Sequence, residues 1–419
     1  MPLLFVAVTR AKDYLKISRV GGNTLPELNE LVTSTDITLD VQDISAALQT
    51  SWEQSYELNS PELRALLTPY LPPRALSVSA LNDFVSCTGC SPENLGSACF
   101  AHKRLLALPQ APSISLEFGS LVHAYFEDYV QYANKYGLDA VDKELRTLLS
   151  TDALQELRAY CTNNGTLENM SVQDAAQTPL PLQVTTDKDD AGAANQSDNI
   201  YSLISYYINR VAALDFEQED VIRCLDRFIA IVHITPEIAR GYSDQCLLRT
   251  EVELTAVVNN EVPLYGKCDL LQINEQDKTI KLIDYKTSLS TKKITTPTAA
   301  YQRQLQFYVY LIENSQEFSG YHVITCEDWY VEPDKQTKQK REPVVSSDSR
   351  DELVHLTQLI VAAWHRITNA NFDTSAFFES SQFVTWKEKY SDKKKMSQDM
   401  KNELQRCYED WLISEDDVL

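Results

Sequence analysis

The sequence has no apolar run that approaches the ~20 residues needed to cross a membrane as a helix. Its first residues, "MPLLFVAVTRAKDYLKISR", have no basic segment before the apolar stretch and no small-residue cleavage site, so no signal peptide is expected. The sequence also lacks a G-x4-GK-[ST] phosphate-binding loop. We therefore expect a cytoplasmic protein with no membrane partner, and one that does not hydrolyse ATP by itself.

The nine cysteines lack the regular spacing of a disulfide framework. Cys87, Cys90 and Cys99 form a C-x2-C-x8-C cluster, but a fourth ligand is missing nearby, and Cys407 stands alone towards the C-terminus. Part of a metal or iron–sulfur site is the alternative interpretation of this cluster. We expect reduced thiols and no iron–sulfur cluster.

Length and charge allow several classes of protein. The 419 residues suffice for two or three domains, and the composition, 43% hydrophobic and 23% charged, is that of a globular protein. The net charge of −22 argues against a protein that coats nucleic acid through its overall field. Basic residues do gather between Lys267 and Arg341, so a local basic groove stays compatible with the sequence.

The domain organisation follows from breaks in the helical and apolar patterns. "TPYLPPRA", residues 68–75, interrupts helical periodicity and indicates a boundary. Residues 163–198 lack periodicity and are rich in Asn, Asp, Thr and Gln, so we expect a disordered insertion. We predict an N-terminal segment 1–40, a helical linker 41–75, a main domain 76–384 and a charged, helix-prone tail 385–419.

Periodicity predicts an α/β (α+β) fold with a small central mixed sheet flanked by helices. A serine N-cap begins a helix in "SVSALNDFVSC". Further helices are expected at 119–133, 138–162, 199–232 (more than one), 298–314 and 350–369, and strands at 246–258, 264–274, 279–286 and 321–331.

Two acids face each other in the predicted hairpin around "NEQDK". If the chain folds back between Gln276 and Asp277, Asp269 lies directly opposite Asp284. Opposed residues in an antiparallel pair have Cβ atoms ~5 Å apart, and like charges there destabilise the sheet. Lys286 points to the same face as Asp284, because strand side chains alternate.

A cation between the two carboxylates would remove this repulsion. Mg²⁺ or Mn²⁺ suits carboxylate oxygens and could polarise a phosphodiester. A nearby lysine could orient the attacking water or stabilise charge on the phosphate. The alternative is a surface hairpin with one salt bridge.

Other polar residues lie at positions that also suit ordinary packing. His123 lies on the apolar face of a helix, where a histidine is more often a core residue than a ligand. Gln304 and Tyr308 are four residues apart and share one helix face. Glu251 and Glu253 lie on the strand before the hairpin, where a solvated acidic face is the default interpretation.

Taken in order, "SVSALNDF", "FGSLVH", "TEVEL", "GKCDLL", "LIDYKTS" and "QLQFY" resemble the RecB-type nuclease domain of the PD-(D/E)XK superfamily. That domain is the C-terminal module of bacterial helicase–nucleases of recombination and repair. The resemblance covers roughly residues 76–315 apart from the insertion, and it implies a restriction-endonuclease-like core.

The resemblance also implies residue roles. The metal ligands would be His123, Asp269, Asp284 and the backbone carbonyl of Tyr285. The catalytic residues would be Asp269, Asp284 and Lys286, with Gln304, Tyr308 and Glu251 in DNA binding or site support. The run "DLLQ" departs from many relatives, in which an arginine and then a second acid follow the first aspartate. The cysteine cluster of some relatives is not carried over, because the tail has only Cys407.

The N-terminal string "LLFVAVTRAKDYLKIS" resembles the last conserved motif of UvrD/Rep-type superfamily 1 helicases. The resemblance implies that Arg10 contacts the γ-phosphate of ATP from a motor domain. Residues 1–40 would then be the remnant of a helicase motor domain. We expect the C-terminal part of a helicase–nuclease, either a gene fragment or one half of a split enzyme, with ATP used only by a missing motor or a separate motor chain.

The function expected from these patterns is a Mg²⁺- or Mn²⁺-dependent deoxyribonuclease whose partner is DNA. The alternative is a non-catalytic DNA-binding or assembly subunit, which the acidic charge and "DLLQ" favour. An ATPase in its own right is disfavoured by the missing phosphate loop. Exonuclease and endonuclease action are both compatible with the motifs.

Overall fold

The computed structural model describes residues 71, 73–91, 95–100, 104–105, 112–164, 199–287, 298–346, 350–391 and 396–416. The predicted helicase remnant with Arg10, most of the predicted linker and residues 165–198 of the predicted insertion lie outside these residues. The predicted domain boundaries therefore stay predictions. Within the described ranges, no helix combines the length and apolar character needed to cross a membrane.

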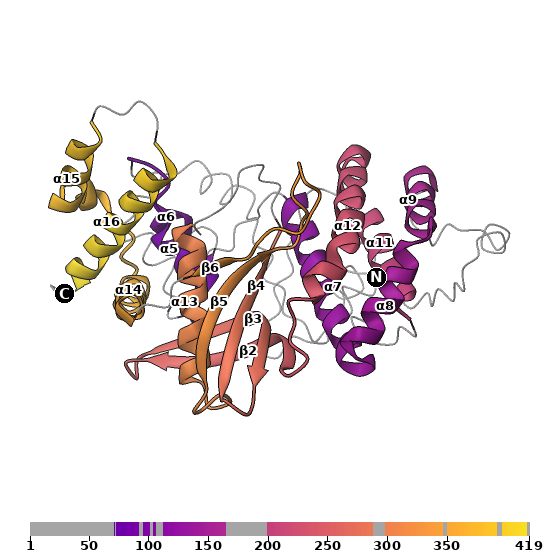
Figure 1. Ribbon diagram of the computed structural model, residues 1–419. Helices are drawn as coiled ribbons and strands as arrows, with labels where there is room; N and C mark the ends of the chain where they lie inside the picture. The colour runs from indigo at the N-terminus through magenta and orange to yellow at the C-terminus, as the bar shows by residue number, and fades with distance from the viewer. Residues whose placement is uncertain are drawn as a thin grey trace, which may run out of the picture. The chain divides into compact units, whose positions relative to one another are not determined.

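A six-stranded mixed sheet forms the centre of the fold (Figure 1). Strand β3 pairs antiparallel with β2 and β4 and parallel with β1, while β5 pairs parallel with β4 and antiparallel with β6. The strands are β1 Leu76–Ser77, β2 Leu247–Val258, β3 Val262–Asn274, β4 Thr279–Lys286, β5 His322–Tyr330 and β6 Val344–Ser346. The predicted mixed sheet flanked by helices is confirmed.

Helices precede, interrupt and follow the strands along the chain. Those before β2 are α5 Val78–Val85, α6 Gly96–Phe100, α7 Ile114–Tyr136, α8 Leu138–Leu149, α9 Ala153–Asn164, α11 Ile200–Ala212 and α12 Gln218–Ala239. The later ones are α13 Ala299–Asn314, α14 Arg350–Thr368, the 3₁₀ turn η6 Ser375–Glu379, α15 Ser381–Lys389 and α16 Gln398–Asp416. The serine N-cap is confirmed at Ser77, whose side chain accepts a hydrogen bond from the N–H of Ala80.

The sheet separates two apolar cores. The core on one face joins α7, α8, α9, α11 and α12 to the sheet, and α7 contacts the strands β2 and β3. The core on the other face joins α5, α13, α14 and α16 to the sheet, and α13 contacts β2, β3, β4 and β5. Strand alternation distributes β4 between them: Leu282 faces the α13 side, whereas Ile283 and Tyr285 face the α7 side. Burial of each such large apolar side chain contributes about 1.5–3 kcal/mol. Both cores therefore hold the strand ends in place.

The single helix predicted at 138–162 is wrong, because two helices occupy this range. Helix α8 ends at Leu149 and α9 begins at Ala153. Between them, the hydroxyls of Ser150 and Thr151 donate to the carbonyl oxygens of Thr147 and Leu148. Such local bonds compete with the helical backbone pattern, which explains the break.

Helix α16 belongs to the core on the α13 face, although its sequence is charged. Its buried residues in that core are Met400, Leu404, Tyr408, Trp411 and Leu412. The side chain of Gln405 donates to the carbonyl of Val85, 2.6 Å away, and accepts from the N–H of Cys87, 2.7 Å away. The tail was predicted to be helical, which is confirmed, but its packing against the first helices was not predicted.

Candidate active site

The hairpin of β3 and β4 has the predicted register. The pair Leu270–Ile283 is the last in the observed ladder, and one further step places Asp269 opposite Asp284. Asp269 is fixed by the backbone, since the N–H of Tyr285 donates to its Oδ2 at 2.8 Å. The two acids therefore come together at the carboxyl end of β4.

Three ligand-type side chains converge beside Asp269. Helix α7 places Nδ1 of His123 at 3.3 Å from Oδ2 of Asp269. One ligand atom each from His123, Glu251 and Asp269 lies within 4.8 Å of the others. One imidazole nitrogen and two carboxylates form a donor set that suits Mg²⁺ or Mn²⁺. The residues present therefore fit a divalent ion.

Glu251 reaches this cluster through an unusual backbone conformation. Its φ angle is +51° within β2, and the ladder between β2 and β3 passes from Thr250 directly to Val252. A non-glycine residue in this region costs about 1–3 kcal/mol, and such strain concentrates at functional sites. Lys267 holds the carboxylate with its Nζ 2.6 Å from Oε2. Glu251, predicted as a supporting residue, thus lies among the candidate ligands.

Lys286 is the centre of a buried polar network on the α13 face. Its ammonium contacts the carboxylate of Asp284 and donates to Oε1 of Gln304 at 2.7 Å. Gln304 in turn donates to the hydroxyl of Tyr308 at 3.3 Å. The predicted sharing of one helix face by Gln304 and Tyr308 is confirmed, and the pair orients the lysine.

A glycine lets α13 approach the sheet closely enough for these contacts. A Cβ atom on Gly266 would lie 2.5 Å from Cδ1 of Leu311 and 3.1 Å from Cε1 of Tyr308. A side chain at this position of β3 would require Leu311 and Tyr308 of α13 to shift. The "GKCDLL" segment therefore contributes a close helix–sheet contact as well as Asp269.

Burial and neighbouring charges shift the protonation of the cluster. Burial lowers the pKa of His123, but Asp269 outweighs it and raises the pKa to about 9. For Asp284, burial raises the pKa to about 7 against the opposing effect of Lys286. Burial disfavours the charged form of Lys286, yet Asp284 and Asp328 outweigh it and the pKa of the lysine is raised. Perturbed groups of this kind concentrate at functional sites.

Asp328 is a third acid in the network, and sequence analysis missed it. It pairs with Asp284 in the parallel ladder of β4 and β5, and its side chain is fully buried. Oδ1 lies 3.8 Å from Nζ of Lys286. The sequence did hold a sign of this role: Asp328 lies near the end of a predicted strand, and the carboxyl ends of neighbouring parallel strands meet at one sheet edge.

Tyr285, between Asp284 and Lys286, points to the opposite core. Its ring stacks on Phe126 with centroids 4.7 Å apart, and its hydroxyl hydrogen bonds that of Tyr242 at 2.8 Å. This contact fixes the end of β4 against α7 and thereby sets the position of His123, on α7, relative to Asp269 and Asp284. The metal-ligand role of the Tyr285 carbonyl stays a prediction.

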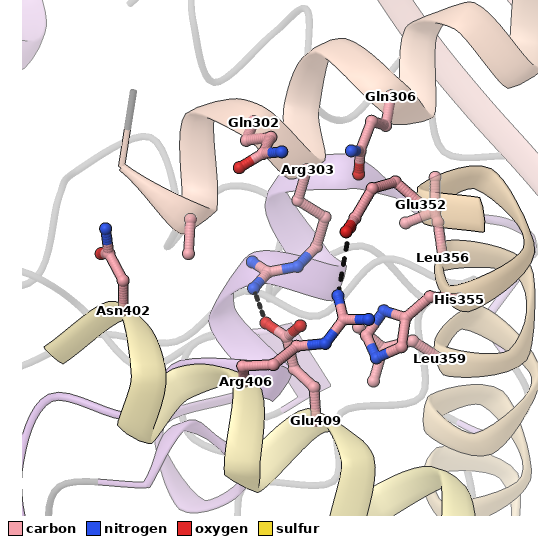
Figure 2. Close-up of a pocket in the computed structure, with 11 residues that line it drawn as sticks. Gln302, Arg303, Gln306, Glu352, His355, Leu356, Leu359, Asn402, Arg406 and Glu409 are labelled. Carbon is pink, nitrogen blue, oxygen red and sulfur yellow. Dashed lines mark hydrogen bonds and ion pairs between the residues drawn. The ribbon is translucent and has the colours of Figure 1, made fainter. Parts of the chain in front are cut away.

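A separate cavity of about 380 Å³ lies between α13, α14 and α16 (Figure 2). Arg303 contacts Glu409 across it, and Arg406 contacts Glu352 with 3.1 Å between Nη1 and Oε2. These four charged side chains are thus paired with one another. Asp269, Asp284 and Lys286 do not line this cavity. The cavity is a junction of three helices.

Comparison with protein families agrees with this geometry. The family described as the PD-(D/E)XK nuclease superfamily matches residues 75–379. The chain belongs to the PD-(D/E)XK nuclease superfamily. Members are nucleases, hydrolases that generally use divalent metal ions, and a nuclease domain would bind DNA. None of the curated proteins compared with the chain matches it.

Proposed function

We propose that this chain is a Mg²⁺- or Mn²⁺-dependent deoxyribonuclease. The observation that carries the proposal is the convergence of His123, Glu251 and Asp269 within 4.8 Å, next to the Asp284–Lys286 pair. A divalent ion held there would supply Lewis-acid polarisation of the scissile phosphate and of the attacking water. Asp284, which lies one step beyond the last pair of the hairpin ladder and so opposite Asp269, would complete the ligand set.

The chain's own residues would prepare the site as follows. The Tyr285 N–H and His123 both hold Oδ2 of Asp269, which limits rotation of that carboxylate. Gln304 fixes the ammonium of Lys286, so its charge can stabilise the phosphate as negative charge develops. Because the lysine is buried and already hydrogen bonded, little reorganisation is needed when substrate arrives.

We further propose that the nuclease acts in recombination or repair as the nuclease module of a UvrD/Rep-type helicase–nuclease. The support is the string "LLFVAVTRAKDYLKIS" before the nuclease motifs. A superfamily 1 motor that lacks its own nuclease and co-purifies with this chain would support the partnership.

The first experiment is a cleavage assay with linear single- and double-stranded DNA in Mg²⁺, Mn²⁺ or EDTA, without ATP. Asp284→Asn keeps the side-chain volume and removes the charge, and it should lower cutting by at least about 10²–10³-fold. The matched control is Asp277→Asn, which changes an exposed acid at the turn of the same hairpin.

The outcomes separate the two functions. Metal-dependent cutting that Asp284→Asn abolishes and Asp277→Asn preserves supports the nuclease. DNA binding without cutting, unchanged in Asp284→Asn, would favour the non-catalytic DNA-binding subunit. Cutting by Asp284→Asn at the wild-type rate would overturn the site assignment.

A further inference from the structure

The carboxylate of Asp328 is buried, yet it has no hydrogen-bond partner among the residues that the structure describes. Its side chain is 0% exposed, and neither carboxylate oxygen accepts a hydrogen bond within the described structure. Its neighbour on β4 is Asp284, a second buried acid. Buried carboxylates are normally hydrogen bonded or paired, because desolvation of the charge is costly. Stability alone would favour an apolar residue at this position.

Lys286 is the cation that contacts Asp328. A lysine ammonium has three N–H donors. The ammonium donates to Oε1 of Gln304 and contacts the carboxylate of Asp284, and Oδ1 of Asp328 and the centre of the Tyr301 ring lie 3.8 and 4.2 Å from Nζ. The ammonium therefore lies between two aspartates that stand side by side on parallel strands.

We propose that Asp328 is a positioning residue that fixes where the Lys286 ammonium lies beside Asp284. The ammonium contacts the Asp284 carboxylate, and Oδ1 of Asp328 on the neighbouring strand lies 3.8 Å from Nζ. This second carboxylate holds the ammonium in the place from which it faces the phosphate. Without Asp328, the ammonium loses its second anionic neighbour, and its place is no longer fixed. The proposal rests on the proposed nuclease function and names a residue that its family motifs do not include.

The kinetic test compares Asp328→Asn with a control on the same strand. Glu327→Gln is the control, since Glu327 is a buried acid on the opposite face that pairs with Lys281 and Trp329. Asp328→Asn should lower kcat by about 100-fold, the cost of a misplaced group, with KM within about twofold. Glu327→Gln should leave kcat within about threefold of wild type.

A second test does not depend on cutting. Thermal melting of wild type, Lys286→Met, Asp328→Asn and the double variant forms a double-mutant cycle. If the two side chains act on each other, Lys286→Met leaves Asp328 buried without a counter-ion and lowers Tm. Adding Asp328→Asn should then recover part of that loss, so the two shifts are non-additive. Glu327→Gln combined with Lys286→Met should be additive.

The kinetic and melting results together test the positioning role of Asp328. A selective loss of kcat together with non-additive melting supports the positioning role. Wild-type kcat in Asp328→Asn, an equal loss in Glu327→Gln, or additive melting overturns it. If the wild-type chain is folded but does not cut, the nuclease proposal fails, and the melting cycle alone decides whether Asp328 holds Lys286.

Discussion

Metal binding by this chain should release protons, and the pH dependence should depend on His123. An imidazole must be neutral to ligate a metal, and metal binding therefore competes with its proton. Asp269 holds that proton in place by raising the pKa of His123 to about 9. The apparent affinity for Mn²⁺ should consequently rise as pH increases towards 9.

The magnitude follows from the pKa. Two pH units below 9, at pH 7, the protonated form of His123 exceeds the neutral form by about 100-fold. Affinity at pH 7 should therefore be about 100-fold weaker than at a pH well above 9, a change of about tenfold per pH unit. Below pH 7 the dependence should steepen, because Asp284, with a pKa of about 7, also begins to hold a proton.

Isothermal titration calorimetry measures both quantities. Titrating Mn²⁺ in buffers with different ionisation enthalpies counts the protons released, with about one expected at pH 7.5–8 and more at pH 6. His123→Asn should bind more weakly but lose most of the dependence between pH 7 and 9. His322→Asn is the control, because His322 is exposed on β5.

Two results would refute this reasoning. If wild-type protein binds Mn²⁺ without releasing a proton between pH 7 and 9, His123 is not a ligand that must lose its proton. If His123→Asn retains the full pH dependence, another group carries the proton. Either result would remove His123 from the proposed ligand set.

Two further predictions concern stability. Glu409→Ala leaves the buried guanidinium of Arg303 without its ion-pair partner and should lower the free energy of unfolding by about 3–5 kcal/mol in urea denaturation. The control is Glu317→Ala, at the exposed ion pair with Arg249, which should change the free energy of unfolding by less than about 1 kcal/mol. Gly96→Ala should destabilise by about 1–3 kcal/mol or more in the same measurement. An added Cβ would lie 2.0 Å from the carbonyl oxygen of Asp83, and backbone cannot move aside as a side chain can. Wild-type stability of Glu409→Ala or of Gly96→Ala would contradict the packing described.

The hairpin was predictable because its determinants are local. A polar turn between two strand-like segments fixes the register, so the opposition of Asp269 and Asp284 followed from counting residues. The helix spacing of Gln304 and Tyr308 was equally local, and both lie on one face of α13. Their contact with Lys286 was not readable from spacing, since it depends on how closely α13 packs on the sheet.

Residues whose roles depend on distant segments were missed or undervalued. Glu251 becomes a candidate ligand only through a positive φ angle that its sequence context does not indicate. Asp328 lies in a predicted strand, but its meaning depends on parallel pairing with β4 across the intervening helix. The packing of α16 was missed because the mean composition of the segment averages its charged face and its apolar face.

The bonds between Gln405 and the end of α5 have a consequence for synthesis of the protein. They join residues 318 and 320 positions apart in the chain. At 5–20 residues per second, the ribosome needs roughly 15–60 s to add that much chain. During this interval α5 lacks its partner helix α16, while helices α7, α8, α9, α11 and α12 can already pack on one another. The core on the α13 face should therefore form last, leaving its apolar residues open to chaperones on the growing chain.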